Sequence, residues 1–180
     1  MKSLNDREIK QFFRQFSQSY DLIPYRVQNE RPDTDLPDCH QCGHPALNRL
    51  CTAFINAYDK VAWGEGYSEQ ELGKTEKIGG WVPLATSDGP IAVNGALLAL
   101  SVLNAHAHYP THRHGPREMY VTVSGGFWFE RIGKERVWVR PGEVVFTEPN
   151  ELHALHNGNA ATLMIACWVG GSYEKSEIVA

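Results

Sequence analysis

The second half of the sequence consists of short β-branched and aromatic runs, with turn signals between and within them. These runs are GALLALSVLNAHAHY (95–109), EMYVTVSGGFWFER (118–131), ERVWVRPGEVVF (135–146) and ATLMIACWVGG (161–171). Gly-Gly, Ile-Gly-Lys, Pro-Gly and Asn-Gly sequences supply the turns. Short strands at this close spacing, with no helix between them, predict an antiparallel sheet that closes as a sandwich, jelly roll or barrel.

In the first part of the chain, the apolar residues recur with the period of an α-helix instead. Apolar residues recur every three or four positions from Asn5 to Tyr20 and again from Ala46 to Trp63, which predicts two amphipathic helices. The stretch between them, NERPDTDLPDCHQCGHP, is rich in Pro and Asp and predicts a loop. We therefore expect an N-terminal α-helical arm over residues 1–75 and a β-barrel over residues 76–180.

The charge and hydropathy of the 180-residue chain argue against several kinds of partner. The formal net charge is −4 and there is no dense block of Lys and Arg, so neither nucleic acid nor an anionic membrane is expected as the main partner. The longest apolar run, GALLALSVLNA, is too short to span a bilayer, and MKSLNDREIKQFF lacks the apolar core of a signal peptide. We expect a cytoplasmic protein whose cysteines are mostly reduced.

Four residues suited to binding a metal ion stand in two groups. His112 and His114 are two positions apart, so on a strand their side chains point the same way, and Glu118 follows across the turn-like GPR. His153 comes much later, after a Pro-Gly turn and one strand. If they converge inside a barrel, these side chains suit one divalent Zn, Fe, Mn, Ni or Co ion. Nitrogen and oxygen ligands without thiolate do not select among these metals.

The spacing of these residues resembles the motifs of the cupin superfamily. The first motif is His-X-His, three or four residues, Glu, six residues and Gly; its members here are His112, His114, Glu118 and Gly125. The second motif runs from Gly through Pro to His and then Asn; its members here are Gly142, Pro149, His153 and Asn157. One departure is Glu151, where the family usually has a glycine. The resemblance covers about residues 97–169 and implies a mainly β protein with a cupin (double-stranded β-helix, or jelly-roll) barrel that holds one metal ion.

The remaining histidines of this region are weaker candidates. His106 and His108 share strand parity with the ligand pair, but Pro110 interrupts the run. We expect these two to line the mouth of the barrel, to support the ligands or to be exposed to solvent. His156 lies an odd number of residues from His153, so on a strand it should face away from the metal.

The cysteines permit a second, structural metal site. Cys39, Cys42, His44 and Cys51 lie close in sequence, and thiolates with an imidazole suit tetrahedral zinc. Against zinc, Cys51 falls on the apolar face of the second predicted helix, where a free cysteine is an ordinary core residue. Reduced thiols are therefore the default expectation. Cys167 lies in an apolar strand and should belong to the core.

Three aromatic residues near the ligands indicate a chemistry. Tyr120 lies two positions after Glu118, Tyr109 just precedes the ligand pair, and Trp168 lies on the last predicted strand. A nearby dication favours the phenolate of a tyrosine, which can then act as a general base. The face of a tryptophan can hold a cation. For Tyr120 the alternative is a side chain that simply packs in the barrel with its hydroxyl on a ligand.

The stretch HYPTHRHGPREMYVTVSGG, together with the helical arm and the late tryptophan, resembles the dimethylsulfoniopropionate (DMSP) lyase-like cupins. That resemblance implies cleavage of DMSP to dimethyl sulfide and acrylate. It implies a metal ion held by His112, His114, Glu118 and His153. It also implies that Tyr120, as the base, and Tyr109 are catalytic residues, and that the substrate pocket contains Tyr109 and Trp168.

Two other functions fit the same ligands. One is a different cupin enzyme, a dioxygenase or an isomerase of a small carboxylate or sugar, which would not need the aromatic set. The other is a non-catalytic metal or small-ligand sensor, although no basic DNA-reading helix is present in the sequence. Arg113 should face away from the ligands, and Arg117 should be solvated or meet an anionic substrate. A homodimer through sheet edges is an open possibility.

Overall fold

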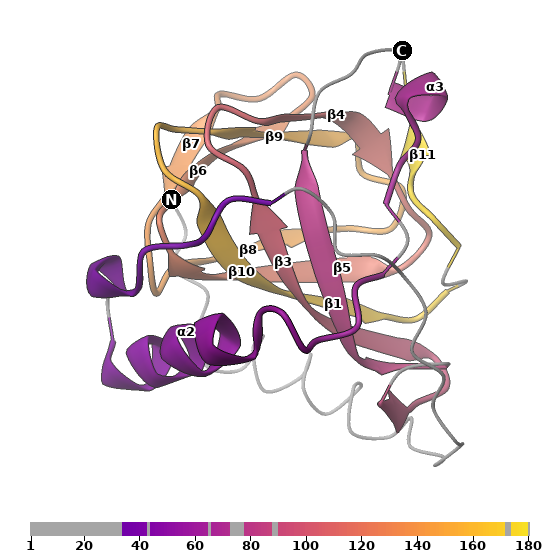
Figure 1. Cartoon of the computed structure of the whole chain (residues 1–180). Coiled ribbons are helices and arrows are strands. Elements are labelled where there is room, and N and C mark those ends of the chain that lie inside the picture. The colour runs from indigo at the N-terminus through magenta and orange to yellow at the C-terminus, as the bar shows by residue number, and fades with distance from the viewer. Residues whose placement is uncertain are drawn as a thin grey trace.

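The structure is a computed structural model that describes residues 34–42, 44–64, 66–72, 78–87, 90–171 and 174–179. The helix predicted from Asn5 to Tyr20 lies outside these residues. The described part consists of a barrel of two antiparallel sheets and a short helical region that packs on its outside (Figure 1). The prediction of a mainly β protein with a helical N-terminal region is confirmed.

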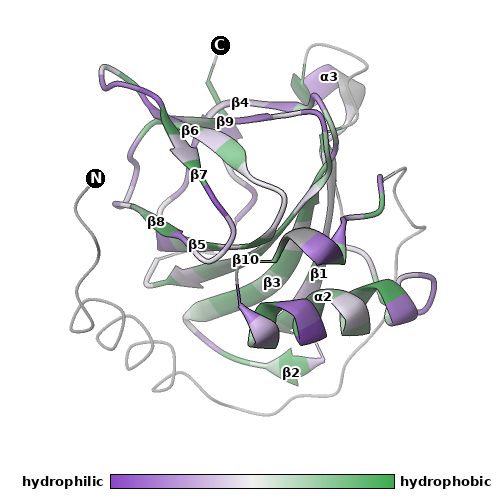
Figure 2. Ribbon diagram, turned by 90° about the vertical axis from the view of Figure 1, so that its left-hand side faces the viewer, coloured by the Kyte–Doolittle hydropathy of each residue, from purple (hydrophilic) through white to green (hydrophobic). Residues whose placement is uncertain are grey.

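The larger sheet has six strands in the order β2-β1-β3-β10-β5-β8. Their bounds are β1 Gly79–Thr86, β2 Ile91–Ala92, β3 Ala96–Leu103, β5 Arg117–Ser124, β8 Val144–Thr147 and β10 Thr162–Val169. All of its pairs are antiparallel except the short pairing of β1 with β2. Hydrophobic residues are concentrated along β1, β3 and β10 (Figure 2).

The smaller sheet has five strands in the order β11-β4-β9-β6-β7. Their bounds are β4 His108–Arg113, β6 Phe127–Arg131, β7 Val137–Val139, β9 His153–Asn157 and β11 Glu177–Ile178. From β3 onward, successive strands mostly alternate between the two sheets, so that strands far apart in sequence, such as β3 and β10, are neighbours within one sheet. This is the jelly-roll arrangement of a double-stranded β-helix. The interior between the sheets is filled by apolar side chains such as Phe127, Phe129 and Leu155.

The strands β3, β5, β6, β7, β8 and β10 coincide with the predicted runs to within one residue, but β1, β2, β9 and β11 lie outside them and β4 extends beyond the end of one. The longest of the strands outside the runs is β1. β1 contains Pro83, which cannot donate to the ladder, and the pairing register with β3 shifts between Pro83 and Ala85. This β-bulge explains why the strand pattern of the segment was too weak to be predicted. The segment nevertheless forms an eight-residue strand because it pairs with β3 over nearly its whole length.

The helical region contains the 3₁₀-helix η1 Cys39–Gln41, the helix α2 Pro45–Ala57 and the one-turn helix α3 Glu69–Leu72. The predicted helix to Trp63 was six residues too long. The ring of Trp63 packs edge-on against Phe54, with centroids 6.1 Å apart, so the chain has to leave the helix and fold back. The start is set by Pro45 in the first turn and by His44, whose Nδ1 accepts a hydrogen bond from the Ala46 amide at 3.1 Å.

The cysteine expectations are only partly met. Cys39 and Cys51 form a disulfide, so the prediction of reduced thiols is wrong for these two, whereas Cys42 and Cys167 are free. The alternative of a structural zinc site does not fit the structure either, because two of its sulfurs bond each other and His44 caps α2 instead. Cys167 is 1% exposed, which confirms its place in the core.

Candidate metal centre

The two sheets bring the four predicted ligands together in the barrel interior. His112 is near the end of β4, His114 follows directly after it, Glu118 lies on β5, and His153 opens β9. His112 and His153 are paired residues of neighbouring antiparallel strands. The four side chains are buried, with His114 the most exposed at 6%. The structure thus brings together residues that are up to 41 positions apart in sequence.

Each histidine is oriented by a backbone carbonyl close to it in sequence. The Nδ1–H groups of His112, His114 and His153 donate to the carbonyl oxygens of Pro110, Pro116 and Glu151, in each case at 2.8 Å. A donating Nδ1 leaves the lone pair of a neutral imidazole on Nε2. Such a bond on the far nitrogen is the usual support of a metal-bound histidine. The three rings therefore present Nε2 to a common point.

The Nε2 atoms are placed as ligands would be. Ligand atoms of His112, His114 and His153 all lie within 4.8 Å of one another, and this is the one metal-competent cluster among the described residues. The Nε2 atoms of His112 and His153 are buried and find no hydrogen-bond partner in the described part of the chain. Buried polar atoms without partners are costly in a stable protein, so these nitrogens fit a bound metal ion.

Glu118 completes the cluster and is itself held in place. Its Oε2 lies 2.9 Å from His114 Nε2 and 3.5 Å from His153 Nε2, and its Oε1 accepts a 2.5 Å hydrogen bond from the indole N–H of Trp168. Burial alone would raise the pKa of Glu118, but the hydrogen bond from His114 and the proximity of His153 together outweigh it and place the pKa below its usual range. The group is therefore a carboxylate, as a metal ligand has to be.

The histidine pKa values differ according to their neighbours. Burial, followed by the proximity of His153, lowers the pKa of His112 to about 3, so this ring is neutral at physiological pH. Burial is the largest influence on His114 and opposes its charged form, but the hydrogen bond to Glu118, the Glu118 charge and the hydrogen bond to the Pro116 carbonyl together outweigh burial and raise the pKa. The raised pKa favours a protonated His114 beside the Glu118 carboxylate, and a metal ion would compete with that proton.

The predicted aromatic residues all lie at this cluster. Tyr120 is buried in the barrel, where its ring meets Phe127 edge-on. Burial, followed by the Glu118 charge, raises the pKa of Tyr120 well above its usual value. The ring of Tyr109 stacks on His112 with centroids 3.8 Å apart. Trp168 stacks on His114 at 4.5 Å, so besides any contact with a substrate it positions two of the ligands.

Sequence reasoning missed Tyr67. Its hydroxyl lies 2.7 Å from that of Tyr109 and its ring is tilted against the Tyr109 ring, with centroids 5.6 Å apart. Tyr67 lies just before α3, some forty residues from the ligands, in a segment with no regular period. No pattern in the sequence connects it to the site; only the folded chain does.

The turn before His153 shows how the chain manages without the family's glycine. Asn150 has φ 61°, in the left-handed region that Asn tolerates better than most residues. Its amide donates to the carbonyl of His114 at 2.8 Å, which ties the two ligand segments together. The Glu151 side chain accepts from the Glu148 amide at 3.1 Å. The departure at Glu151 thus leaves the ligand position intact.

The other basic side chains point away from the cluster. His156 pairs with Glu130 at 3.1 Å and stacks on His108 at 4.2 Å, so neither joins the metal-competent group, as expected. Arg113 pairs with Glu177 at 2.8 Å on the surface, which confirms that it faces outward. Arg117 pairs with Glu148, at 3.1 Å.

Two facing antiparallel sheets that enclose a His-X-His pair, a glutamate and a late histidine define a cupin with a site that could hold a metal ion. The family model for DMSP lyase matches residues 26–164, and the chain belongs to this family. It is therefore a lyase of the DMSP lyase class. No curated protein sequence matches the chain. Among the described residues, no helix is both long and apolar enough to cross a membrane.

Solved structures agree with the fold. DMSP lyase DddQ from Ruegeria pomeroyi DSS-3 superposes with a TM-score of 0.73 at 18% identity, over 97% of this chain and 98% of that one. A chain from the crystal structures of the DMSP lyases RdDddP and RnDddQII gives 0.71 at 23% identity, over 88% and 86%. The polyketide cyclase RemF from Streptomyces resistomycificus gives 0.50 at 15% identity, over 58% and 72%.

Proposed function

We propose that this protein cleaves DMSP to dimethyl sulfide and acrylate by β-elimination at a metal centre formed by His112, His114, Glu118 and His153. The observation that carries the proposal is the pair of buried, unpartnered Nε2 atoms of His112 and His153 beside the Glu118 carboxylate. Membership of the DMSP lyase family supports this substrate. When bound, the ion supplies the positive charge that binds the substrate carboxylate, acidifies the neighbouring C–H and favours the Tyr120 phenolate.

Tyr120 is the proposed base. Its phenolate oxygen takes the proton from the carbon next to the substrate carboxylate, and the electron pair of that C–H bond forms the new carbon–carbon double bond. The C–S bond breaks at the same time, and its electrons go to sulfur, which leaves as neutral dimethyl sulfide. The proton that Tyr120 gains returns to solvent after acrylate departs. In the protein alone, burial and the charge of Glu118 keep this phenol neutral.

Trp168 and Tyr109 are the proposed contacts of the sulfonium. Cation–π contact with an aromatic face contributes about 0.5–2 kcal/mol. One face of Trp168 lies on His114, and its N–H holds Glu118, so the indole is fixed before a substrate arrives. No described Arg or Lys pairs with the cluster, which suits a cationic tail better than an anionic one.

The identity of the metal, the oligomeric state and the location belong to the proposal as well. The nitrogen and oxygen ligands suit zinc or iron, and also Mn, Ni or Co. Pairing through sheet edges would give a homodimer, which light scattering of the purified protein tests. A cytoplasmic location was predicted from the sequence; the Cys39–Cys51 disulfide is more typical of oxidising compartments, so cell fractionation is the appropriate test.

The proposal is tested by giving DMSP to the zinc-loaded protein and measuring dimethyl sulfide by gas chromatography. We expect release that depends on the protein, and acrylate in equal amount. A panel of small carboxylates assayed for oxygen uptake runs in parallel. Oxygen uptake without release of dimethyl sulfide would replace the lyase with a cupin dioxygenase, and binding without any turnover would indicate a small-ligand sensor.

A further inference from the structure

Tyr67 has no role in the reaction as described, yet its hydroxyl reaches the site. It lies 2.7 Å from the hydroxyl of Tyr109 and 3.2 Å from the carbonyl oxygen of Ser176. Tyr109 in turn stacks on the ligand His112. A chain of two phenols thus runs from the metal cluster to the C-terminal segment.

The direction of these hydrogen bonds follows from the Ser176 carbonyl at the end of the chain. A backbone carbonyl only accepts, so the single proton of the Tyr67 hydroxyl is donated to Ser176. The Tyr67 oxygen can then only accept from Tyr109, whose proton is turned toward Tyr67. The Ser176 side chain also interacts with the Tyr109 oxygen. Tyr109 therefore has a remaining lone pair, and no hydrogen, for a ligand beside His112.

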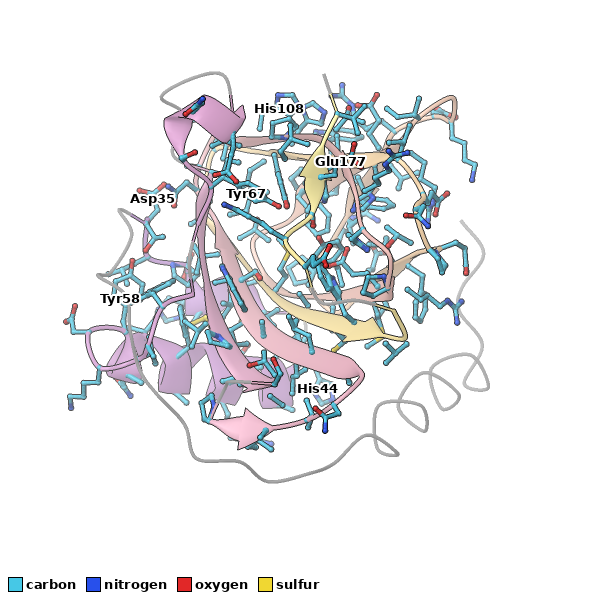
Figure 3. The ribbon with its side chains drawn as sticks, turned by 90° about the vertical axis from the view of Figure 1, so that its right-hand side faces the viewer. Asp35, His44, Tyr58, Tyr67, His108 and Glu177 are labelled. Atoms are coloured by element: carbon cyan, nitrogen blue, oxygen red, sulfur yellow. A yellow bond between two sulfur atoms is a disulfide. The ribbon has the colours of Figure 1, made fainter. Side chains whose placement is uncertain are left out.

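Tyr67 is fixed by charged groups on its far side. Lys175 Nζ lies 4.5 Å from the centre of the Tyr67 ring and pairs with the Glu71 carboxylate at 2.7 and 2.8 Å. Figure 3 shows Tyr67 and Glu177 at the same end of the barrel, where β11 pairs with β4 opposite His112. We call the set Tyr67, Glu71, Lys175 and Ser176 the tyrosine clasp. It holds the phenol chain in one orientation.

We infer that Tyr67 is a positioning residue that makes the site select substrates with a cationic tail, an inference that rests on the proposed function. By taking the proton of Tyr109, Tyr67 leaves that oxygen as a pure acceptor, whose partial negative charge faces a sulfonium or ammonium group. A neutral tail of the same shape gains nothing from this orientation. The clasp therefore contributes to the choice of substrate and not to the chemical step.

The test uses two ligands that have no good leaving group. Trimethylammonio-propanoate carries a cationic tail, and its carbon isostere, with a quaternary carbon in place of nitrogen, has the same shape without the charge. Calorimetry measures the affinity of both for the zinc-loaded protein. In Tyr67→Phe, which keeps the ring, we expect the cationic ligand to bind about fivefold more weakly, the size of one net hydrogen bond. The neutral isostere should bind as before, within about twofold.

Tyr58→Phe is the matched control. Its hydroxyl donates to the Thr34 carbonyl at 2.8 Å, away from the cluster, so both ligands should bind to this variant as to the wild type. An equal loss of both ligands in Tyr67→Phe would make Tyr67 merely structural and overturn the inference, as would no loss of either. If the wild type binds neither ligand but releases dimethyl sulfide, selection by the clasp is wrong and the lyase proposal stands. If the wild type shows neither binding nor release, both fall.

Discussion

Two regions of this molecule exclude water equally well but are built in opposite ways. Where α2 packs on the large sheet, the contacts are apolar: Phe54, Tyr58 and Trp63 meet edge-on and cover Val82 and Val123. Inside the barrel, the metal cluster consists of buried imidazoles and a carboxylate. The first region gains its free energy mainly from apolar burial and leaves one donor, the indole N–H of Trp63, without a hydrogen-bond partner in the described structure. The second leaves two imidazole nitrogens without hydrogen-bond partners, and these two have lone pairs that can bind a metal ion.

The difference shows which residues serve the fold and which serve the chemistry. A cluster that is partly unsatisfied in the protein alone gains its missing interactions from a ligand, and so binding adds to its stability. The helix interface requires no ligand. Substitutions in the metal cluster should therefore reduce activity, whereas substitutions in the helix interface should reduce the free energy of unfolding.

The largest effect is expected from removing a ligand. His153→Ala deletes one of the three converging imidazoles, so we expect zinc affinity to fall at least about a hundredfold and release of dimethyl sulfide to disappear. Zinc should raise the melting temperature of the wild type and not that of the variant. Calorimetric zinc titration and thermal melts check both. A variant that binds zinc as tightly as the wild type would remove His153 from the site.

The next effect concerns the proposed base. Tyr120→Phe keeps the ring and removes the hydroxyl, so turnover should fall by about 10²–10⁴-fold, as for loss of general base catalysis. The zinc content, measured by elemental analysis, should stay at the wild-type level. The matched Tyr58→Phe variant should keep full activity, because its phenol lies in the helix interface. Wild-type turnover by Tyr120→Phe would leave Tyr120 with a packing role.

A substitution in the helix interface should lower stability and leave activity unchanged. Phe54 is 3% exposed, and Phe54→Ala leaves a cavity between α2 and the sheet, so the free energy of unfolding should fall by about 3–5 kcal/mol. Urea unfolding measures this loss. Activity per folded molecule should be unchanged. A change in KM or kcat beyond the loss of folded protein would show that the two regions are coupled.

The smallest effect is expected at the tyrosine clasp. The hydrogen bond from Lys175 lowers the pKa of Glu71 from 4.5 to about 2. A carboxyl group whose pKa is lower in the folded protein than in the unfolded chain stabilises the fold when the pH is above the unfolded-state pKa. This contribution is lost as the pH falls through the folded-state pKa. Glu71→Gln should therefore lower the melting temperature by about a degree at neutral pH, and by less as the pH falls below about 4. A difference that widens in acid would contradict this assignment.

The sequence predicted the ligands better than their surroundings. Strand parity placed His112 and His114 on one face. The resemblance to the cupin motifs added Glu118 and His153, and the fold brings all four side chains together. The disulfide of Cys39 with Cys51 could not be predicted, since sequence spacing does not determine which thiols approach each other. The place of Tyr67 at the site could not be predicted for the same reason, because its partner Tyr109 is 42 residues away in sequence and only the fold brings the two together.

The central claim is that the reaction needs one metal ion held by the three imidazoles and Glu118. The most direct test titrates zinc into metal-free wild-type protein and measures the rate of dimethyl sulfide release from DMSP at each addition. The account predicts no release without metal and a rise that saturates at one zinc ion per chain. Full release by the metal-free protein, or a rate that zinc does not change, would contradict it.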